Sequence, residues 1–223
     1  MVSDVSFNRR VLFENHRLFK EDQMTVTNKP APGPSPLTCC PRSQVKRAPQ
    51  RASYEREPAY ALIDRLKTAH VAFVEAGEPR IVPLTVWRLG DNLYLHTLNG
   101  GRMSQRLASG ALICISFAVT NEWVMTKSAF HHSANYESLV LFGRASQVTD
   151  DSEFDGAFRA IIDQLDPGRW DQVRAPNAKE RKATALFRVP IVEGAFKSRT
   201  GGPNDDPGDL DLPVWHGTLP AGY

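Results

Sequence analysis

The sequence contains few cysteines and no long apolar run, and each absence excludes a class of protein. Cys39, Cys40 and Cys114 are the only cysteines, too few and too unevenly spaced for a disulfide framework. No stretch approaches the roughly 18 apolar residues of a membrane span, and the start of the chain lacks an export signal. The formal net charge of +2 provides no general attraction to nucleic acid or anionic lipid. We therefore expect a cytoplasmic protein with reduced thiols, and neither nucleic acid nor a membrane as partner.

Several common catalytic motifs are also absent. The chain has no G-x-x-x-x-G-K-[ST] loop, no G-x-G-x-x-G turn, no G-x-S-x-G elbow and no C-x-x-C pair. These absences argue against the common nucleotide hydrolases, Rossmann dehydrogenases, α/β-hydrolases and thiol redox proteins. The histidines are scattered apart from the pair His131 and His132, so no zinc-ligand spacing is present. The sequence predicts no metal site.

The N-terminal part of the chain is polar, basic and rich in proline. Four prolines between residues 30 and 36 favour extended, unpaired backbone. A basic run follows, made by Arg42, Lys46, Arg47 and Arg51. This composition is typical of a solvated tail. We therefore expect a disordered leader over residues 1–52, in which Met24 is an alternative start, and one folded domain over residues 53–223.

The rest of the chain alternates between strand patterns and a few helical ones. A helix is expected near Glu57, where apolar residues recur at helical spacing: Ala59, Leu62, Ile63 and Leu66. Segments rich in β-branched residues and bounded by tight turns predict strands at 70–75, 80–88, 93–97, 111–118, 123–127, 137–149 and 187–196. Further helices are predicted at 102–108, 151–165 and 178–185. Because strands and helices do not alternate, we predict a mainly β fold, an antiparallel barrel with peripheral helices.

One polar segment, Thr97–Leu107, has the composition of a phosphate site. A strand ends at Thr97, the pair Gly100-Gly101 lets the backbone approach a ligand closely, and a helix opens with Arg102. Exposed amides and an arginine suit a phosphate group. An ordinary glycine turn with a surface arginine is the alternative, and the residues alone leave both open.

A second polar segment, Ser128–Ser138, contains adjacent histidines between two strands. His131 and His132 stand close to Asn135 and Tyr136. Neighbours on an extended chain point to opposite faces, so the two imidazoles do not chelate one metal ion together. The functional interpretation is that one histidine lines a cofactor pocket. The alternative is two loop residues whose ring nitrogens bond to the backbone.

These segments resemble a known family. Arg80–Thr85 (RIVPLT) and Thr97–Met103 (TLNGGRM) resemble the flavin motif of the pyridoxamine 5'-phosphate oxidase superfamily, in which R-x-V-L-L-K precedes T-N-x-x-S-R-K. Three further segments resemble its nitroimidazole-reductase-like branch: SAFHHSANYESLVLFGRA (128–145), PGRWDQVR (167–174) and LPVWHGTLP (212–220). The resemblance covers about residues 54–220.

The resemblance implies an FMN-binding split barrel, a six-stranded, Greek-key-like antiparallel barrel that dimerises with the cofactor at the interface. Thr97 and Arg102 would hold the phosphate, and the backbone of Arg80–Thr85 would edge the isoalloxazine. Ser138 would approach from the partner. The implied cofactor-binding residues are Arg80, Val82, Leu84, Thr85, Thr97, Gly101, Arg102, Met103 and Ser138.

The sequence departs from the family pattern at several positions. Thr85 and Met103 replace basic residues, and Gly101 stands where a serine is usual, so fewer groups hold the phosphate. Pyridoxamine phosphate oxidases also carry an Arg-x-His element near the C-terminus, which Trp215–Pro220 lacks. We therefore do not expect oxidation of vitamin B6.

The sequence thus predicts an FMN-dependent oxidoreductase that acts on a small-molecule acceptor. His132 or His131 would be catalytic, by bonding to the flavin or donating a proton to the substrate, because an imidazole titrates near neutrality. The alternative is a non-enzymatic flavin- or heme-binding sensor, in which His131 or His132 would be an axial heme ligand. A deazaflavin in place of FMN is a further alternative. The substrate and the electron donor are not readable from these residues.

Overall fold

Strands of one antiparallel sheet dominate the chain. The computed structural model describes residues 35–222. Its strands are β1 (Ala52–Ser53), β2 (Thr68–Glu75), β3 (Glu78–Leu89), β4 (Asn92–Leu98), β5 (Leu112–Met125), β6 (Ser133–Arg144), β7 (Ser146–Gln147), β8 (Thr184–Pro190), β9 (Glu193–Arg199) and β10 (Gly217–Pro220). Its helices are α1 (Arg56–Leu66), α2 (Arg102–Ala108), α3 (Asp151–Leu165) and α4 (Ala178–Ala183). The predicted mainly β fold is confirmed.

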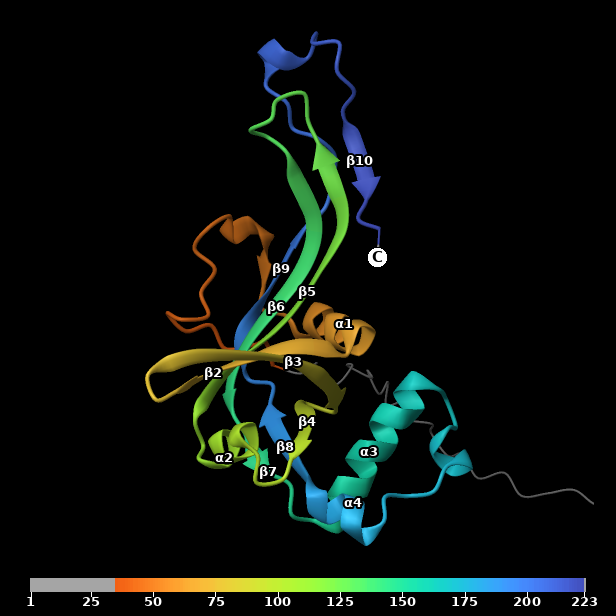
Figure 1. Ribbon diagram of the computed structural model, residues 1–223. Helices are drawn as coiled ribbons and strands as arrows, with labels where there is room; N and C mark the ends of the chain where they lie inside the picture. The colour runs from red at the N-terminus through yellow and green to blue at the C-terminus, as the bar shows by residue number, and fades with distance from the viewer. Residues whose placement is uncertain (1–34, 223) are drawn as a thin grey trace, which may run out of the picture. The chain divides into compact units, whose positions relative to one another are not determined.

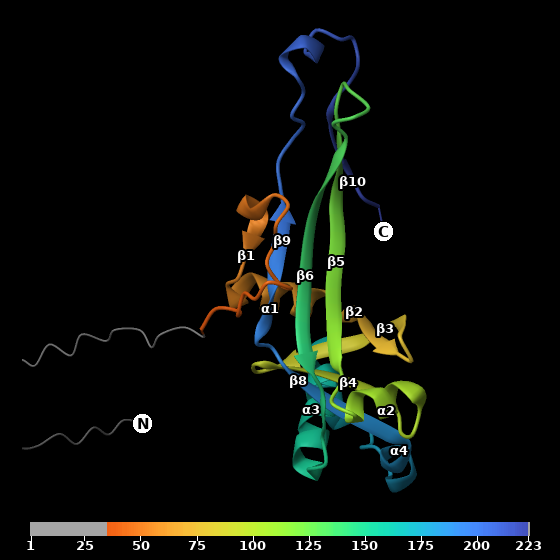
Figure 2. The ribbon, with the colours of Figure 1, turned by 90° about the vertical axis from the view of Figure 1, so that its left-hand side faces the viewer.

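The strands follow the order β1-β9-β6-β5-β2-β3-β4-β8-β7, and β10 pairs with β5. The strands β5 and β6 run together as a long hairpin, with β9 beside β6 and β10 beside β5 (Figure 1 and Figure 2). The sheet has ten strands. The expected segments account for β2 to β9, and the short strands β1 and β10 are additional. In the described part of the chain, no helix is both long and apolar enough to cross a membrane.

Two strand predictions need correction. The segments 111–118 and 123–127 belong to one strand, β5, whose pairing with β6 shifts register between Thr120 and Glu122. The segment 187–196 is two strands, because the chain leaves β4 as the partner of β8 and joins β6 as the partner of β9. Tertiary pairing, which sequence periodicity does not report, decides both outcomes. The predicted helices at 102–108 and 151–165 have the observed bounds.

Gly194 lies where β9 starts along β6. A Cβ atom at this position would stand 2.4 Å from the carbonyl oxygen of Val140, a separation that no side chain tolerates. Only glycine therefore lets the two backbones approach this closely. The change of strand partner between β8 and β9 depends on this close approach.

The hydrophobic core lies on the inner face of the sheet. Side chains of β2, β5, β6 and β8 pack there against helix α1, with Val71, Ile115, Phe117, Leu139 and Phe187 fully buried. Helix α3 covers β3 and β4 through a second cluster around Trp87, whose Nε1–H donates to the carbonyl oxygen of Ala157 at 2.9 Å. Burial of this apolar surface is the main stabilising contribution. On the opposite, outer face, the segment Arg42–Val45 lies against β6 and β9, with the guanidinium of Arg42 5.5 Å from the centroid of the Phe142 ring.

The chain before α1 packs against the sheet, contrary to the expected disorder. Leu37 is 3% exposed, and its backbone N–H donates to the carbonyl oxygen of Tyr54 at 2.7 Å. The Nε–H of Arg42 donates to Oε1 of Glu193 at 2.7 Å, and this hydrogen bond lowers the pKa of the Glu193 carboxyl. The prediction of a disordered leader is therefore wrong for residues 35–52, because one apolar anchor carries no periodic signal. Residues 1–34, with Met24, lie outside the described residues.

The docking of this segment is tested by replacing its anchor. Because Leu37 is buried, Leu37→Ala should lower the free energy of unfolding by about 2–3 kcal/mol. Urea unfolding followed by circular dichroism measures the change. Leu210→Ala is the control, because Leu210 is exposed and a surface substitution changes stability by less than about 0.5 kcal/mol. Equal stability of Leu37→Ala and the parent protein would show that the segment is a free tail.

Candidate functional site

Two buried polar atoms flank the turn between β4 and α2. Among the described residues, Oγ1 of Thr97 and Nε of Arg106 are buried and have no hydrogen-bond partner. An unpaired buried polar group costs about 1–3 kcal/mol, so each such group requires an explanation. Arg106 lies one helical turn after Arg102, on the same side of α2. The turn thus holds an unused hydroxyl and an unused guanidinium N–H, both of which suit an anionic ligand.

The turn itself is shaped for close approach of a ligand. Gly100 has a φ of +75°, a left-handed conformation that favours glycine. A Cβ atom on Gly101 would lie 3.0 Å from the carbonyl oxygen of Leu98, so the serine usual here would crowd the turn. The departure from the family pattern at Gly101 therefore has a local steric reason.

A carboxylate lies between the two predicted arginines. Oε2 of Glu75, at the end of β2, is 3.8 Å from Nε of Arg80 and 3.5 Å from Nε of Arg102. Arg80 comes from β3 and Arg102 from α2, so the structure brings together two residues far apart in the sequence. All three side chains are partly exposed, and such ion pairs contribute at most about 1 kcal/mol. An arriving anion therefore replaces Glu75 at little cost.

Strand β3 has an open edge along Arg80–Thr85. It pairs with β2 from Glu78 to Thr85, but its pairing with β4 begins only at Val86. Pro79 and Pro83 have no N–H to donate to a neighbouring strand. The side of β3 on which their N–H groups would lie is the side that faces away from β2. The N–H groups of Ile81 and Thr85 share this alternation and also face the open edge, while the side chains of Val82 and Leu84 pack against the core. This edge provides backbone donors for a planar polar ligand.

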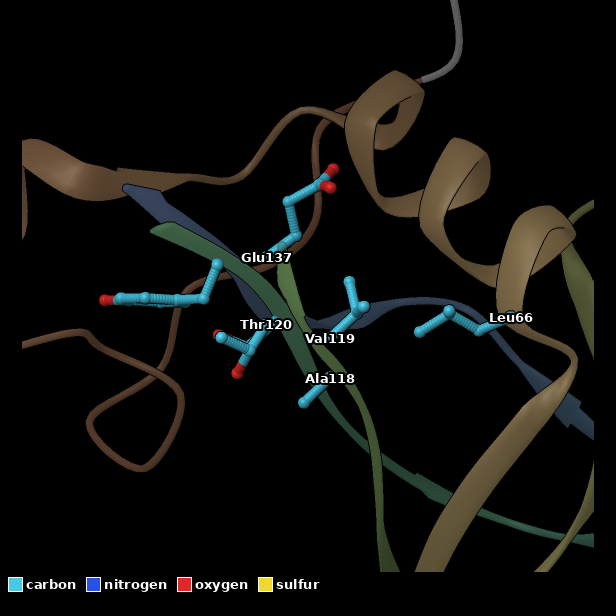
Figure 3. A pocket seen from close by; sticks show the side chains of 7 residues that line it. Leu66, Ala118, Val119, Thr120 and Glu137 are labelled. Atoms are coloured by element: carbon cyan, nitrogen blue, oxygen red, sulfur yellow. The ribbon is translucent and has the colours of Figure 1, made fainter. Parts of the chain in front are cut away.

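A pocket of about 660 Å³ opens where β5 lacks a neighbour on one edge (Figure 3). On that edge β5 pairs with β2 through Cys114–Ser116 and with β10 through Glu122–Met125. The pocket lies between these two stretches, and its lining comprises Leu66, Ala118, Val119, Thr120, Tyr136, Glu137 and Ser138. In Figure 3 Glu137 and Thr120 project to opposite sides of the strands. The predicted cofactor-binding residue Ser138 is thus one of the residues that line this pocket.

The predicted catalytic histidines lie at the far end of the long β5–β6 hairpin. Nε2 of His131 is 3.1 Å from Oδ2 of Asp206, and Nδ1 of His132 donates to the carbonyl oxygen of Ser128 at 3.0 Å. In both ribbon views this hairpin end is remote from α2, the helix that begins at Arg102 (Figure 1 and Figure 2). Within one chain the structure does not bring His131 or His132 to the open edge of β3.

Comparison with known proteins identifies the family. The model of the pyridoxamine 5'-phosphate oxidase family matches residues 55–198. This chain belongs to that family. The match confirms the resemblance carried by Arg80–Thr85 and Thr97–Met103. A comparison with curated proteins finds no match.

Solved structures of similar proteins support the same assignment. The flavocytochrome Anf3 from Azotobacter vinelandii is 34% identical, with a TM-score of 0.78 over 84% of this chain and 87% of that chain. The FAD and heme binding protein from Mycobacterium smegmatis is 32% identical, with a TM-score of 0.72 over 76% and 83%. A putative 5-nitroimidazole antibiotic resistance protein from Bacteroides thetaiotaomicron, 18% identical with a TM-score of 0.56 over 66% and 85%, shows the fold alone.

The predicted site residues of this family member fall into separate groups. Arg80, Thr97, Gly101 and Arg102 surround Glu75 or lie at the adjoining turn. Val82, Leu84 and Thr85 lie along β3, and Ser138 lines the pocket. Met103 packs against the core, so it adds no charge to the turn.

Sequence reasoning missed two residues of the turn. Glu75 gave no signal, because a glutamate before the Ala76-Gly77 turn looks like an ordinary strand end. Arg106 had a usable signal, since it follows Arg102 by four residues and therefore shares its helix face. An inspection of helical spacing around the motif would have found Arg106.

The unpaired hydroxyl of Thr97 is tested by Thr97→Val, which keeps the shape of the side chain. In flavin-free protein the free energy of unfolding should stay equal or rise by up to about 1 kcal/mol, because a buried unpaired group is removed. Binding of FMN should weaken roughly tenfold, the value of one hydrogen bond to a charged group. Chemical unfolding and fluorescence titration with FMN measure the two effects.

Thr68→Val is the matched control, because Thr68 is an exposed strand threonine and should change neither quantity. Unchanged FMN affinity in Thr97→Val would remove Thr97 from the site.

Proposed function

We propose that this protein binds FMN at the β4–α2 turn and the open edge of β3, and that it is an oxidoreductase acting on a small acceptor. The observation that carries this proposal is that Oγ1 of Thr97, at the end of β4, and Nε of Arg106, in α2, are both buried without a hydrogen-bond partner. The residues present fit a phosphate group, since donors of the turn lack partners and Arg102 is held only by an exposed ion pair. The family and the relatives named for flavin support the same ligand.

Each element has a defined role in this proposal. A bound flavin supplies hydride and electron transfer, while the protein binds and orients it. Thr97 and Arg102 hold the phosphate, with Arg106 replacing the positive charge that Met103 lacks. The N–H groups of Ile81 and Thr85 orient the polar edge of the ring system. FAD shares the ribityl phosphate that this turn recognises, so analysis of the released flavin distinguishes it from FMN.

The outer face of the sheet supports a homodimer. Ile81 is 64% exposed on this face, and Leu112 and Val140 are also exposed there. Strand register places Ile81 beside Ala72, which pairs in turn with Cys114. Contiguous exposed apolar side chains mark protein interfaces. We propose that two copies pair through this face with the flavin between them, Ser138 approaching from the partner. Proton donation by His131 or His132 then requires the hairpin of the partner protomer.

The flavin site is tested with variants of α2. Arg102→Ala should weaken FMN binding roughly 10- to 100-fold, because a hydrogen bond to a charged group contributes about 1.5–3 kcal/mol. Arg102→Lys should retain part of the affinity, because it keeps the positive charge. Flavin content of the purified protein and titration with FMN measure these effects. Full flavin content in Arg102→Ala would exclude the turn as the phosphate site.

Enzyme activity is tested on the same preparation. Loss of the flavin absorption bands on adding NADPH, at rates that sustain turnover of an acceptor, distinguishes an oxidoreductase from a flavin-binding sensor. A flavin that stays oxidised with NADPH and NADH would contradict the oxidoreductase proposal while leaving flavin binding intact.

The homodimer is tested with Ile81→Asp. A charge on the outer face, at the open edge of β3, should shift the protein from dimer to monomer, because desolvating an unpaired carboxylate at an interface is unfavourable. Analytical ultracentrifugation measures the oligomeric state. Leu165→Asp is the matched control, since Leu165 is also 64% exposed but lies at the end of α3. A dimer that persists in Ile81→Asp places the interface elsewhere.

Heme is a second proposed ligand. Two relatives above 30% identity are named as a flavocytochrome and as an FAD and heme binding protein. Heme iron in proteins is commonly ligated by histidine, and this chain has six histidines. The earlier candidates His131 and His132 each engage a ring nitrogen in a contact at the hairpin end.

A further inference from the structure

We infer that a pocket at the end of β1 is a second phosphate site, which binds the phosphate group of a small molecule other than the flavin. The pocket has a volume of about 580 Å³, within the roughly 300–1,000 Å³ of small-molecule sites. It lies where β9 continues past β1, because β1 pairs only with Phe196 and Lys197 of β9. Figure 2 shows β1, β9 and β6 side by side in this part of the sheet.

The lining of this pocket is basic and polar. Seven of its eight residues are polar or charged, and none of the eight is acidic or aromatic. The lining includes two arginines, two serines, a threonine and an asparagine, which are Arg51, Arg199, Ser53, Ser198, Thr200 and Asn204. A guanidinium group binds phosphate through paired N–H donors, and hydroxyl and amide groups add single hydrogen bonds. The lining therefore suits a phosphate group rather than a flat apolar ring.

Neutral groups hold Arg199 in position. Its guanidinium donates to Oδ1 of Asn135. It also donates to the carbonyl oxygens of Gly201 at 3.1 Å and Gly202 at 3.0 Å. Glu122 is reached only through Asn135, whose Nδ2 donates to Oε2 of Glu122 at 2.6 Å. The charge of Arg199 is thus fixed in place without a contacting carboxylate, as an anion site requires.

The second guanidinium comes from the N-terminal segment. Arg51 ends the short 3₁₀ turn Pro49–Arg51 and directly precedes β1. It is half-buried, yet among residues 35–222 its side chain makes no hydrogen bond and no ion pair. The basic run that reads as a solvated tail in the sequence therefore supplies a guanidinium to the pocket.

The arginines of two other pockets are already neutralised. Arg42 lines a pocket between residues 42–45 and β6 and is paired with Glu193. Arg181 lines a pocket beside α3 and is paired with Asp151 and Asp155. The pocket at the end of β1 differs from both, because its two arginines contact no carboxylate of the described residues.

The acidic residue next to this lining is also occupied. Asp205 follows Asn204, but its side chain is 1% exposed. Its carboxylate accepts from the backbone N–H of Lys127 at 2.7 Å and contacts Nδ1 of His216. The His216 contact lowers the pKa of the Asp205 carboxyl. This carboxylate is therefore engaged elsewhere and does not compete with a ligand for the two arginines.

Strand register places this pocket beside the pocket that Ser138 lines. On β6 and β9, Tyr136 is the partner of Arg199 and Ser138 is the partner of Lys197. Tyr136 and Ser138 both line the β5–β6 pocket, and paired strands are about 5 Å apart. Two sources of phosphate fit the proposed oxidoreductase. One is the 2'-phosphate of NADPH, which arginine binds in other proteins, and the other is a phosphorylated acceptor.

The test titrates inorganic phosphate into the flavin-loaded, full-length protein, in which the flavin occupies the turn after β4. Isothermal titration calorimetry at constant ionic strength measures the affinity. Arg51→Ala should weaken phosphate binding at least roughly tenfold, because a charge-assisted pair is lost, and Arg51→Lys should retain part of the affinity. Arg47→Ala is the matched control, since it removes an exposed charge of the same basic run outside the lining. It should change the affinity by less than about twofold, because exposed charges are screened.

The outcomes that overturn the inference are separate from those that overturn flavin binding. A flavin-loaded parent without saturable phosphate binding excludes the site, and so does equal affinity in Arg51→Ala and the parent. If the protein retains no flavin, the flavin-free protein is titrated with phosphate. Loss of binding in Arg102→Ala but not in Arg51→Ala then assigns the phosphate to the turn after β4 and overturns the second site. Circular dichroism checks folding, and Arg51→Gln replaces a variant that fails to fold.

Competition identifies the source of the phosphate. NADP⁺ and NAD⁺ differ only in the 2'-phosphate, so each is used to displace inorganic phosphate from the flavin-loaded parent. Displacement by NADP⁺ at a concentration at least roughly tenfold lower than by NAD⁺ supports the electron donor as the ligand, because one lost charge-assisted hydrogen bond has about this effect. Saturable phosphate binding that neither dinucleotide displaces supports a phosphorylated acceptor instead.

Discussion

Two prolines in one strand prevent the sheet from continuing past β3 at the proposed site. Pro79 and Pro83 have no N–H to donate, so the side of β3 that they face stays unpaired from Arg80 to Thr85. The strand is held from the other side alone, by β2. This opening leaves the backbone N–H groups of Ile81 and Thr85 without a strand partner at the edge.

The candidate site contains the buried polar side-chain atoms that lack hydrogen-bond partners in the described residues. Most polar groups of the described residues are paired, yet Thr97 and Arg106 are left without partners beside one glycine turn. Arg102 is paired with the carboxylate of Glu75 alone, and Arg80 is paired with Glu75 and Glu78, all through partly exposed ion pairs. A folded protein accepts such unpaired groups where a ligand compensates for them. The outer face also carries exposed apolar side chains, those of Ile81, Leu112 and Val140.

The spacing of residues along the sequence correctly predicted helices, because the hydrogen bonds of a helix join residues close together in the chain. Helix α3 has a clear apolar stripe and α2 follows a glycine pair, and both have the predicted bounds. The errors concern contacts between distant residues. The chain passes from β8 to β9 because Gly194 lets β9 approach Val140, and Leu37 anchors the N-terminal segment through burial. Neither contact produces a periodic pattern in the sequence, since each depends on a single residue that packs against residues far away in the chain.

The sequence alone determined the mainly β class, the family resemblance and the turn with Thr97 and Arg102, because these rest on residue spacing along a continuous segment. Only the tertiary structure decided which residues meet across segments. It placed Glu75 between Arg80 and Arg102 and put His131 and His132 at the far end of the hairpin. The reason is that strand pairing and side-chain alternation bring together residues that are far apart in the chain, and local spacing does not encode that pairing.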